Sequence, residues 1–206
     1  FVQVFESTRG MRVGDEAEFQ GHMLEVTLGP GMLSRNYDGL QNDLDKMEGV
    51  FLKRGDYTFA LDNDKKWDFK PLAKAGDTVS AGDWLGEVDE NFQPHKIMVP
   101  FKFEGSYTVK SVVPAGQYTI NDTMAVLTDE NGTDVNVTKW PVKKAITCYK
   151  EKPRPFKLLE TGVRTIDTVN PIVEGGTGFI PGPFGTGKTV LQHSISKQAE
   201  ADIVII

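Results

Sequence analysis

One eight-residue segment constrains the fold of this chain more than any other part of the sequence. It matches the pattern G-x-x-x-x-G-K-[ST] at every fixed position and consists of Gly182, Pro183, Phe184, Gly185, Thr186, Gly187, Lys188 and Thr189. In proteins this pattern forms a loop between the end of a β-strand and the start of an α-helix. The segment therefore predicts a strand before it and a helix after it.

The residues around the loop agree with that order. A strand is predicted at 178–181, and a helix at 188–200, where Val190, Leu191, Ser194 and Ile195 recur at helical spacing. An apolar run at 203–206 predicts a second, buried strand. Strand, loop, helix and strand in this order are the opening of a parallel α/β sheet. Because two strands do not make a domain, we expect the chain to be a piece of a longer protein.

The spacing of the loop fits phosphate chemistry. Its glycines allow a sharp turn that points backbone N–H groups inward, and the helix N-terminus adds partial positive charge. Lys188 is expected to reach the β- and γ-phosphates of a nucleotide, and Thr189 to offer its hydroxyl to Mg²⁺. We assign nucleotide binding to the eight loop residues and Val190, with Lys188 as the catalytic residue and Thr189 as the metal contact. The structural alternative is a Gly-rich turn before an ordinary helix, with Lys188 solvated. His193, on the same helix, is interpreted as a surface or packing residue rather than a catalytic one.

Composition excludes several other classes of function. With 23 Lys and Arg against 29 Asp and Glu, the net charge of −6 gives no basic field for a nucleic acid. A single cysteine, Cys148, forms no internal disulfide and has no catalytic partner pattern. No apolar run has the length of a membrane span, and the N-terminal residues do not resemble a signal peptide. We expect a cytoplasmic protein, in which the Asn-x-Thr triplets at Asn121, Asn131 and Asn136 belong to turns.

Up to about residue 140 the sequence predicts a β-rich module. Strand-like runs at 23–27, 96–99, 106–113 and 124–127 are separated by Gly-Asp, Pro-Gly, Asn-Asp and Asn-Gly turn signals. A weak repeat relates 75–88 to 115–127. Each segment begins with Ala-Gly and contains a Gly-Asp or Asn-Asp turn beside an extended run. Two such halves predict a small two-sheet sandwich of the kind found in biotinyl and lipoyl carrier domains. Lys96, midway between the halves, is then a candidate site of attachment, although its neighbours differ from those of carrier lysines.

The loop and the segments before it resemble a known family. The stretch 180–190, with Phe184 inside the loop, is similar to the nucleotide loop of the catalytic A subunits of V/A-type rotary ATPases. The segments 161–167 and 171–177 resemble the approach to that loop in rotary ATPases, and 28–33 and 37–41 resemble the stretch after the N-terminal barrel of A subunits. The segments 65–67, 76–86 and 95–100 resemble the bulge, an insertion of A subunits. Three details depart from the family pattern: Lys143 after Val142, the later position of Pro-Arg-Pro at 153–155, and Asn170 before Pro171. They bear on the subfamily, for which we expect a bacterial or archaeal type.

The resemblance implies a mixed fold, a barrel-sandwich-like β bulge followed by the beginning of a P-loop α/β nucleotide-binding domain. It implies three regions: 1–50 after the N-terminal barrel, 51–130 as the bulge, and 131–206 as the loop part of the nucleotide-binding domain. Arg164 and Asp167 are expected to be structural supports near the loop.

The resemblance also implies a function. Three A and three B subunits would form a ring that hydrolyses or synthesises ATP with Mg²⁺, coupled to H⁺ or Na⁺ transport. The other expected partners are the central and peripheral stalks, with no nucleic acid and only an indirect link to the membrane. The water-polarising Glu and the Walker B Asp of the family are expected beyond residue 206, so we expect the chain alone to be inactive. The alternatives are a non-rotary P-loop ATPase such as a Rho-like hexamer, a carrier module, or an assembly role with a dormant loop.

Overall fold

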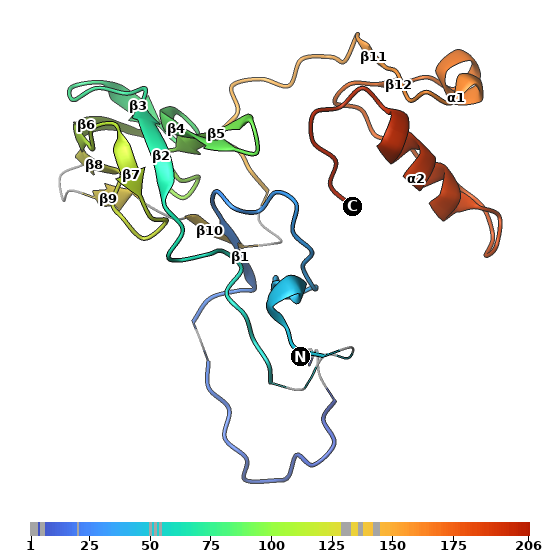
Figure 1. Cartoon of the computed structure of the whole chain (residues 1–206), viewed down its shortest axis with the longest axis horizontal. Helices are drawn as coiled ribbons and strands as arrows, with labels where there is room; N and C mark the ends of the chain where they lie inside the picture. Colours follow the sequence, from blue (N-terminus) through green and yellow to red (C-terminus); the bar gives the residue numbers. More distant parts are fainter. Residues whose placement is uncertain are drawn as a thin grey trace. The chain divides into compact units, whose positions relative to one another are not determined.

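The computed structural model describes residues 4, 7–19, 21–49, 51, 53, 55–128, 133–135, 138–141 and 145–206. The chain divides into two compact units, the first ending at Tyr149 and the second spanning Lys150–Ile206 (Figure 1). The predicted turn residues Asn131 and Asn136 lie outside the described residues, whereas Asn121 lies in an exposed turn. In the described ranges, every helix falls short of the length and apolarity that a bilayer crossing requires.

The regular elements of the first unit are strands, apart from one short 3-10 helix. Its elements are β1 (Glu25–Leu28), the 3-10 helix η1 (Leu44–Lys46), β2 (Trp67–Pro71), β3 (Thr78–Ser80), β4 (Trp84–Glu90), β5 (Gln93–Met98), β6 (Ser106–Val112), β7 (Gly116–Tyr118), β8 (Ala125–Thr128), β9 (Thr133–Val135) and β10 (Thr138–Pro141). Two four-stranded antiparallel sheets carry most of them, in the orders β5-β4-β2-β7 and β3-β6-β8-β9. A separate antiparallel pair joins β1 to β10.

The predicted repeat of 75–88 and 115–127 lies within two larger halves, β2 to β5 and β6 to β9, which exchange strands. The first half gives β2, β4 and β5 to one sheet and β3 to the other, whereas the second half gives β6, β8 and β9 to one sheet and β7 to the other. The turns match as well. The Asp83 carboxylate accepts the N–H of Ser80 at 2.7 Å, and Asp122 accepts that of Thr119 at 2.6 Å, 39 positions further along. The sequence repeat is therefore a structural repeat, closed in both halves by an aspartate turn.

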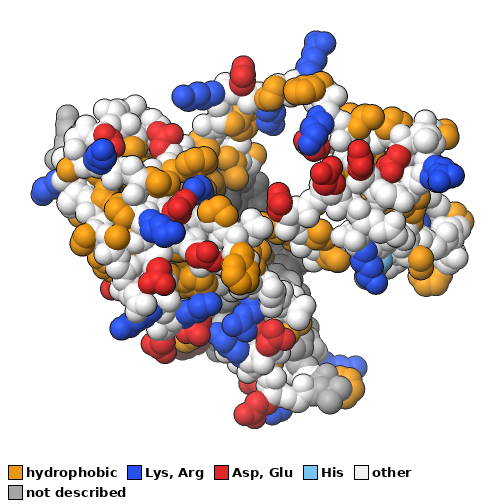
Figure 2. All heavy atoms as spheres, turned by 45° about the horizontal axis from the view of Figure 1, so that its top comes forward, with side chains coloured by type: hydrophobic (Ala, Val, Ile, Leu, Met, Phe, Trp, Pro, Cys, Tyr) orange, Lys and Arg blue, Asp and Glu red, His pale blue; other side chains and the backbone are white. Residues whose placement is uncertain are grey.

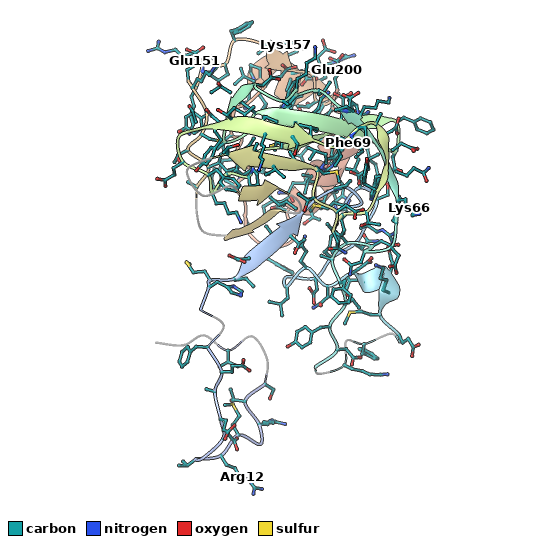
Figure 3. All side chains as sticks on the ribbon, turned by 90° about the vertical axis from the view of Figure 1, so that its left-hand side faces the viewer. Arg12, Lys66, Phe69, Glu151, Lys157 and Glu200 are labelled. Carbon is teal, nitrogen blue, oxygen red and sulfur yellow. The ribbon has the colours of Figure 1, made fainter. Side chains whose placement is uncertain are left out.

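The hydrophobic core lies between these sheets. Leu85 of one sheet packs with Val109 and Leu127 of the other, and all three side chains are almost completely buried. A second cluster surrounds Phe69, which is 1% exposed and lies within the strand layers in Figure 3. Fully burying side chains of this size stabilises a fold by about 1.5–3 kcal/mol each relative to exposing them.

The second unit contains few regular elements. It has the short antiparallel pair of β11 (Leu158–Leu159) and β12 (Ile172–Val173), the helix α1 (Arg164–Val169) between them, and the helix α2 (Lys188–Gln198). The helix predicted at 188–200 is confirmed to within two residues. The strands predicted at 178–181 and 203–206 are wrong, since neither segment is paired in the structure. A strand requires a hydrogen-bonded neighbour, and in the described residues none lies beside either segment.

Candidate nucleotide-binding loop

The loop before α2 owes its shape to its glycines. Gly185 and Gly187 both have φ of +82°, in the left-handed region that side-chain-bearing residues rarely adopt. Gly187 is the N-cap residue of α2, and its carbonyl accepts the N–H of Leu191 at 3.0 Å. The chain therefore turns sharply and enters the helix directly, as the sequence pattern predicts.

Two side chains fold back over the start of the loop. Lys188 donates from Nζ to the carbonyl of Gly182, and the Thr186 hydroxyl donates to the carbonyl of Pro183 at 2.8 Å. A Cβ added at Gly182 would lie 2.6 Å from Thr186 Oγ1, closer than real Cβ contacts allow. The side chains thus close around a backbone position that has room only for glycine. The ammonium group of Lys188 therefore lies against the first residue of the loop.

The electrostatics of this loop suit an anion. The free N–H groups at the start of α2 carry partial positive charge, and the first turn of the helix contains no acidic residue. Lys188, in the same turn, adds a full positive charge. Thr189 follows it and is exposed, so its hydroxyl is open to a ligand or ion. The residues present fit a phosphate group, because they offer a cation, backbone donors and a hydroxyl together.

The remaining predicted binding residues are exposed. Phe184 and Val190 have exposed fractions of 104% and 73%, and Pro183 is exposed as well. His193 is also exposed on α2. The structure thus brings Gly182, Thr186 and Lys188 together around one loop, and leaves Phe184 and Val190 at its rim.

Asp167 lies in α1, and its hydrogen bonds reach the segment beside the C-terminal end of α2. Its carboxylate accepts from the hydroxyl of Thr161 at 2.7 Å and from the N–H of Thr161 at 3.0 Å, which lowers its pKa, the hydroxyl having the larger effect. The backbone beside Thr161 meets the C-terminal end of α2, where the N–H of Glu200 donates to the carbonyl of Glu160 at 3.1 Å. Asp167 is therefore a structural support, but its hydrogen bonds lie away from the loop. The expectation of a place near the loop is wrong for this residue.

Lys96 does not lie where a carrier lysine would be exposed. It belongs to β5, pairs in register with Glu87, and forms an ion pair with that carboxylate while its Nζ lies 4.9 Å from the centre of the Trp84 ring. The tip of the hairpin lies at Asn91 and Phe92, and Phe92 is 95% exposed. The carrier alternative is therefore not favoured.

Sequence reasoning missed Glu90. This carboxylate is 2% exposed and accepts the N–H groups of Gly31 and Leu33 at 2.7 and 2.9 Å and Nδ1 of His95 at 2.7 Å. It ties the segment after β1 to the β4–β5 hairpin. The signal available in the sequence is an acidic residue at an inward-facing position of a strand, which requires partners once it is buried.

Two family models match the chain. The ATPsynthase alpha/beta subunit barrel-sandwich domain matches residues 58–143, and the nucleotide-binding domain of the ATP synthase alpha/beta family matches residues 162–206. The chain therefore belongs to the ATP synthase alpha/beta family. The predicted fold class, a β-rich barrel-sandwich module followed by the beginning of a nucleotide-binding domain, is confirmed.

Within this family the chain is similar along its whole length to V-type ATP synthase alpha chains. The relative from Treponema denticola is 52% identical over 211 aligned residues, and those from Borrelia recurrentis and Borrelia hermsii are 50% and 51% identical. Each alignment covers 100% of this chain and 36% or 37% of the relative. The chain thus spans little more than a third of the length of these relatives. The predicted resemblance to V/A-type catalytic subunits is confirmed.

Proposed function

We propose that this chain is part of the catalytic subunit of a V/A-type rotary ATPase and that its loop binds the phosphates of ATP. The observation that carries the proposal is the closed loop before α2, with Lys188 folded onto Gly182, in a chain similar throughout to V-type ATP synthase alpha chains. In the complete assembly the subunit hydrolyses or synthesises ATP in a process coupled to H⁺ or Na⁺ transport.

Each loop residue has a separate task in this proposal. Gly182, Gly185 and Gly187 allow the backbone N–H groups to approach the phosphates, and Lys188 neutralises the β- and γ-phosphate charge. Thr189 holds Mg²⁺, which when bound neutralises the charge that develops between those phosphates. Thr186 keeps the loop closed through its hydrogen bond to Pro183. Phe184 and Val190 border the bound nucleotide.

The proposal extends to organisation and partners. Residues 1–50 follow an N-terminal barrel, 51–130 form the bulge, and 131–206 belong to the nucleotide-binding domain. The subunit alternates with a B subunit in a ring of three copies each, and the ring contacts the central and peripheral stalks. It lies in the cytoplasm and meets the membrane only through the ion-translocating sector. The 206 residues alone bind nucleotide without useful turnover, since the resemblance assigns the water-polarising Glu and the Walker B Asp to other parts of the subunit.

Calorimetry with Mg-ATP on the 206-residue chain tests the loop. Lys188→Ala is expected to lower the affinity by about 10- to 100-fold, because it removes a charge-assisted contact to phosphate. Lys197→Ala is the matched control: it removes the same charge from the last turn of α2 and is expected to leave the affinity unchanged. Equal affinities for the chain and its Lys188→Ala variant would contradict the assignment of the loop.

A second variant separates the metal from the phosphates. Thr189→Val keeps the shape of the side chain and removes the hydroxyl. We expect it to bind ATP in the absence of Mg²⁺ as the unmodified chain does, and to lose the gain in affinity that Mg²⁺ gives. A gain from Mg²⁺ that is unchanged in Thr189→Val would exclude Thr189 as the metal contact.

A further inference from the structure

The segment that follows β1 forms one wall of an apolar cavity in the first unit. The cavity has a volume of about 250 Å³, is half open, and lies against the β5-β4-β2-β7 sheet. Residues 29–34, which we call the strap, contribute Gly29, Pro30 and Met32 to its lining, and the segment after β7 contributes another wall. The position of the strap therefore determines how far this side of the cavity is open to solvent.

The strap is anchored to a single part of the sandwich. Its backbone forms turns, but in the described residues none of its N–H or C=O groups is paired with the backbone of another segment. Gly31 and Leu33 donate their N–H groups to Oε1 of Glu90 at 2.7 and 2.9 Å, and the side-chain amide of Asn91 donates to the hydroxyl of Ser34 at 3.4 Å. Glu90 and Asn91 are neighbours at the end of the β4–β5 hairpin, so the polar anchors of the strap lie at one point.

Glu90 is the stronger of the two anchors. Its carboxylate is buried, and its second oxygen accepts Nδ1 of His95 at 2.7 Å, which fixes the direction of the first oxygen toward the strap. Hydrogen bonds to an ionised acceptor are shorter and stronger than those between neutral groups. The contact between Asn91 and Ser34 is neutral, long and exposed. The loss of the Glu90 carboxylate therefore removes most of the polar attachment of the strap.

The backbone of the strap can turn at defined places. Gly29 and Gly31 stand on either side of Pro30, and Gly31 has φ of +107°, a conformation that suits glycine. Ser34, at the other end of the strap, has φ of +61°. A segment that shares few backbone hydrogen bonds with the rest of a protein opens more easily than its core strands do. The strap has this character, whereas the strands beneath it are paired on both sides or lie in the core.

From the anchoring at one carboxylate, the glycines beside Pro30 and the cavity behind the segment, we infer that the strap is a hinged wall that opens while the sandwich stays folded. Glu90 is its latch. While the carboxylate holds the N–H groups of Gly31 and Leu33, the strap lies against the cavity, and its release exposes the apolar lining on this side. The inference stands apart from the proposed function, because it uses none of the residues of the nucleotide loop.

Hydrogen exchange measured by NMR on the full 206-residue chain tests whether the strap opens separately. The comparison is with the N–H of Val99, which is buried in the sandwich and donates to the carbonyl of Asp83 at 2.9 Å. After correction for the exchange rates of an unstructured peptide, Gly31 and Leu33 are expected to exchange about tenfold faster than Val99 or more. Equal protection of all three groups would mean that the strap opens only when the sandwich unfolds, and would overturn the inference.

Variants at Glu90 test the latch. Glu90→Met keeps the length of the side chain and removes both acceptors, and it is expected to speed the exchange of Gly31 and Leu33 by about 10- to 100-fold. Glu90→Gln keeps one acceptor oxygen and is expected to lie between Glu90→Met and the unmodified chain. Glu87→Gln is the matched control, since Glu87 lies in the same strand and pairs with Lys96 instead of the strap. Unchanged exchange of Gly31 and Leu33 in Glu90→Met would overturn the role of Glu90.

Thiol labelling tests whether release of the strap opens the cavity. In a chain with Cys148→Ser, Met124→Cys places a thiol in the cavity lining, and Leu127→Cys places one in the core cluster outside that lining. Adding Glu90→Met is expected to speed the reaction of Met124→Cys with Ellman's reagent about tenfold or more. The reaction of Leu127→Cys is expected to stay slow, which shows that the sandwich remains folded. Equal rates for Met124→Cys with and without Glu90→Met would overturn the opening of the cavity.

Discussion

The two units of this chain are stabilised in different ways. In the described residues, every buried apolar side chain belongs to the first unit, where Phe69, Leu85 and Leu127 are at most 1% exposed. Among its described residues the second unit buries only Thr161, a polar residue, and exposes apolar side chains such as Phe156, Phe179 and Phe184. Apolar side chains are visible at the surface in Figure 2. The sandwich is held by a core, whereas the shape of the loop rests on hydrogen bonds between residues a few positions apart.

The strongest test of this comparison removes the largest fully buried side chain. Phe69→Ala leaves a cavity in the cluster around this ring and is expected to lower the free energy of unfolding of the first unit by about 3–5 kcal/mol. Leu191→Ala, on α2, is expected to lower stability by less than about 1 kcal/mol, since Leu191 is only partly buried. Urea unfolding followed by tryptophan fluorescence measures the first unit, which holds all three tryptophans, and helical circular dichroism, to which α2 contributes, follows the second. Equal losses in the two variants would mean that the second unit has a core comparable to the first.

A smaller effect is expected from adding one methyl group to the sandwich. A Cβ at Gly86 would lie 2.2 Å from Cε2 of Phe69 and 2.8 Å from the carbonyl oxygen of Lys70. Gly86→Ala is therefore expected to cost about 1–3 kcal/mol by overpacking. Gly39→Ala is the matched control, because nothing lies within 4 Å of the added atom, and its cost should stay within about 0.5 kcal/mol. Thermal unfolding of both variants measures the difference, and a Gly86→Ala variant as stable as the control would contradict the close packing.

The two halves of the sandwich offer a test of the repeat. Asp83→Ala and Asp122→Ala each remove the carboxylate that closes the turn between two strands. We expect both to lower the midpoint of thermal unfolding, by similar amounts and by less than Gly86→Ala does. Asp15→Ala is a control, since its carboxylate accepts the N–H of Arg12 in the exposed N-terminal segment, away from the sandwich turns; Arg12 is labelled in Figure 3. A loss in one half only would show that the turns are equivalent in shape but not in strength.

The smallest expected effect concerns an arrangement that occurs in both units, an aspartate that accepts hydrogen bonds from a threonine. Asp122 and Asp167 each accept from a threonine, and both have lowered pKa values. For Asp122 the backbone N–H of Thr119 has the largest effect, whereas for Asp167 it is the hydroxyl of Thr161. Thr161→Val is therefore expected to raise the pKa of Asp167 more than Thr119→Val raises that of Asp122. Carboxyl ¹³C NMR titration measures both, and the reverse order would contradict the assignment.

The same shifts fix the direction of the dependence on pH. Because the pKa of each carboxyl is lower in the folded than in the unfolded chain, its stabilising effect is complete above the ordinary aspartate value of about 3.9. The effect is lost as the pH falls through the lower folded value. Acid therefore weakens the Asp122 turn and the Asp167 support alike.

The sequence by itself determined the features whose partners lie close together along the chain. The spacing of the glycines and Lys188 predicted the loop and the start of α2, because a turn and a helix cap involve residues only a few positions apart. The repeated Asp turns at Asp83 and Asp122 were visible for the same reason. The family resemblance rested on these local patterns as well.

Only the tertiary structure decided the pairings between distant residues. Three features depend on which strands lie side by side. They are the exchange of β3 and β7 between the sheets, the burial of Glu90 under the segment after β1, and the ion pair between Lys96 and Glu87. The strands predicted at 178–181 and 203–206 were wrong for the same physical reason. An apolar run has the potential to form a strand, but only a neighbouring backbone with free N–H and C=O groups makes it one.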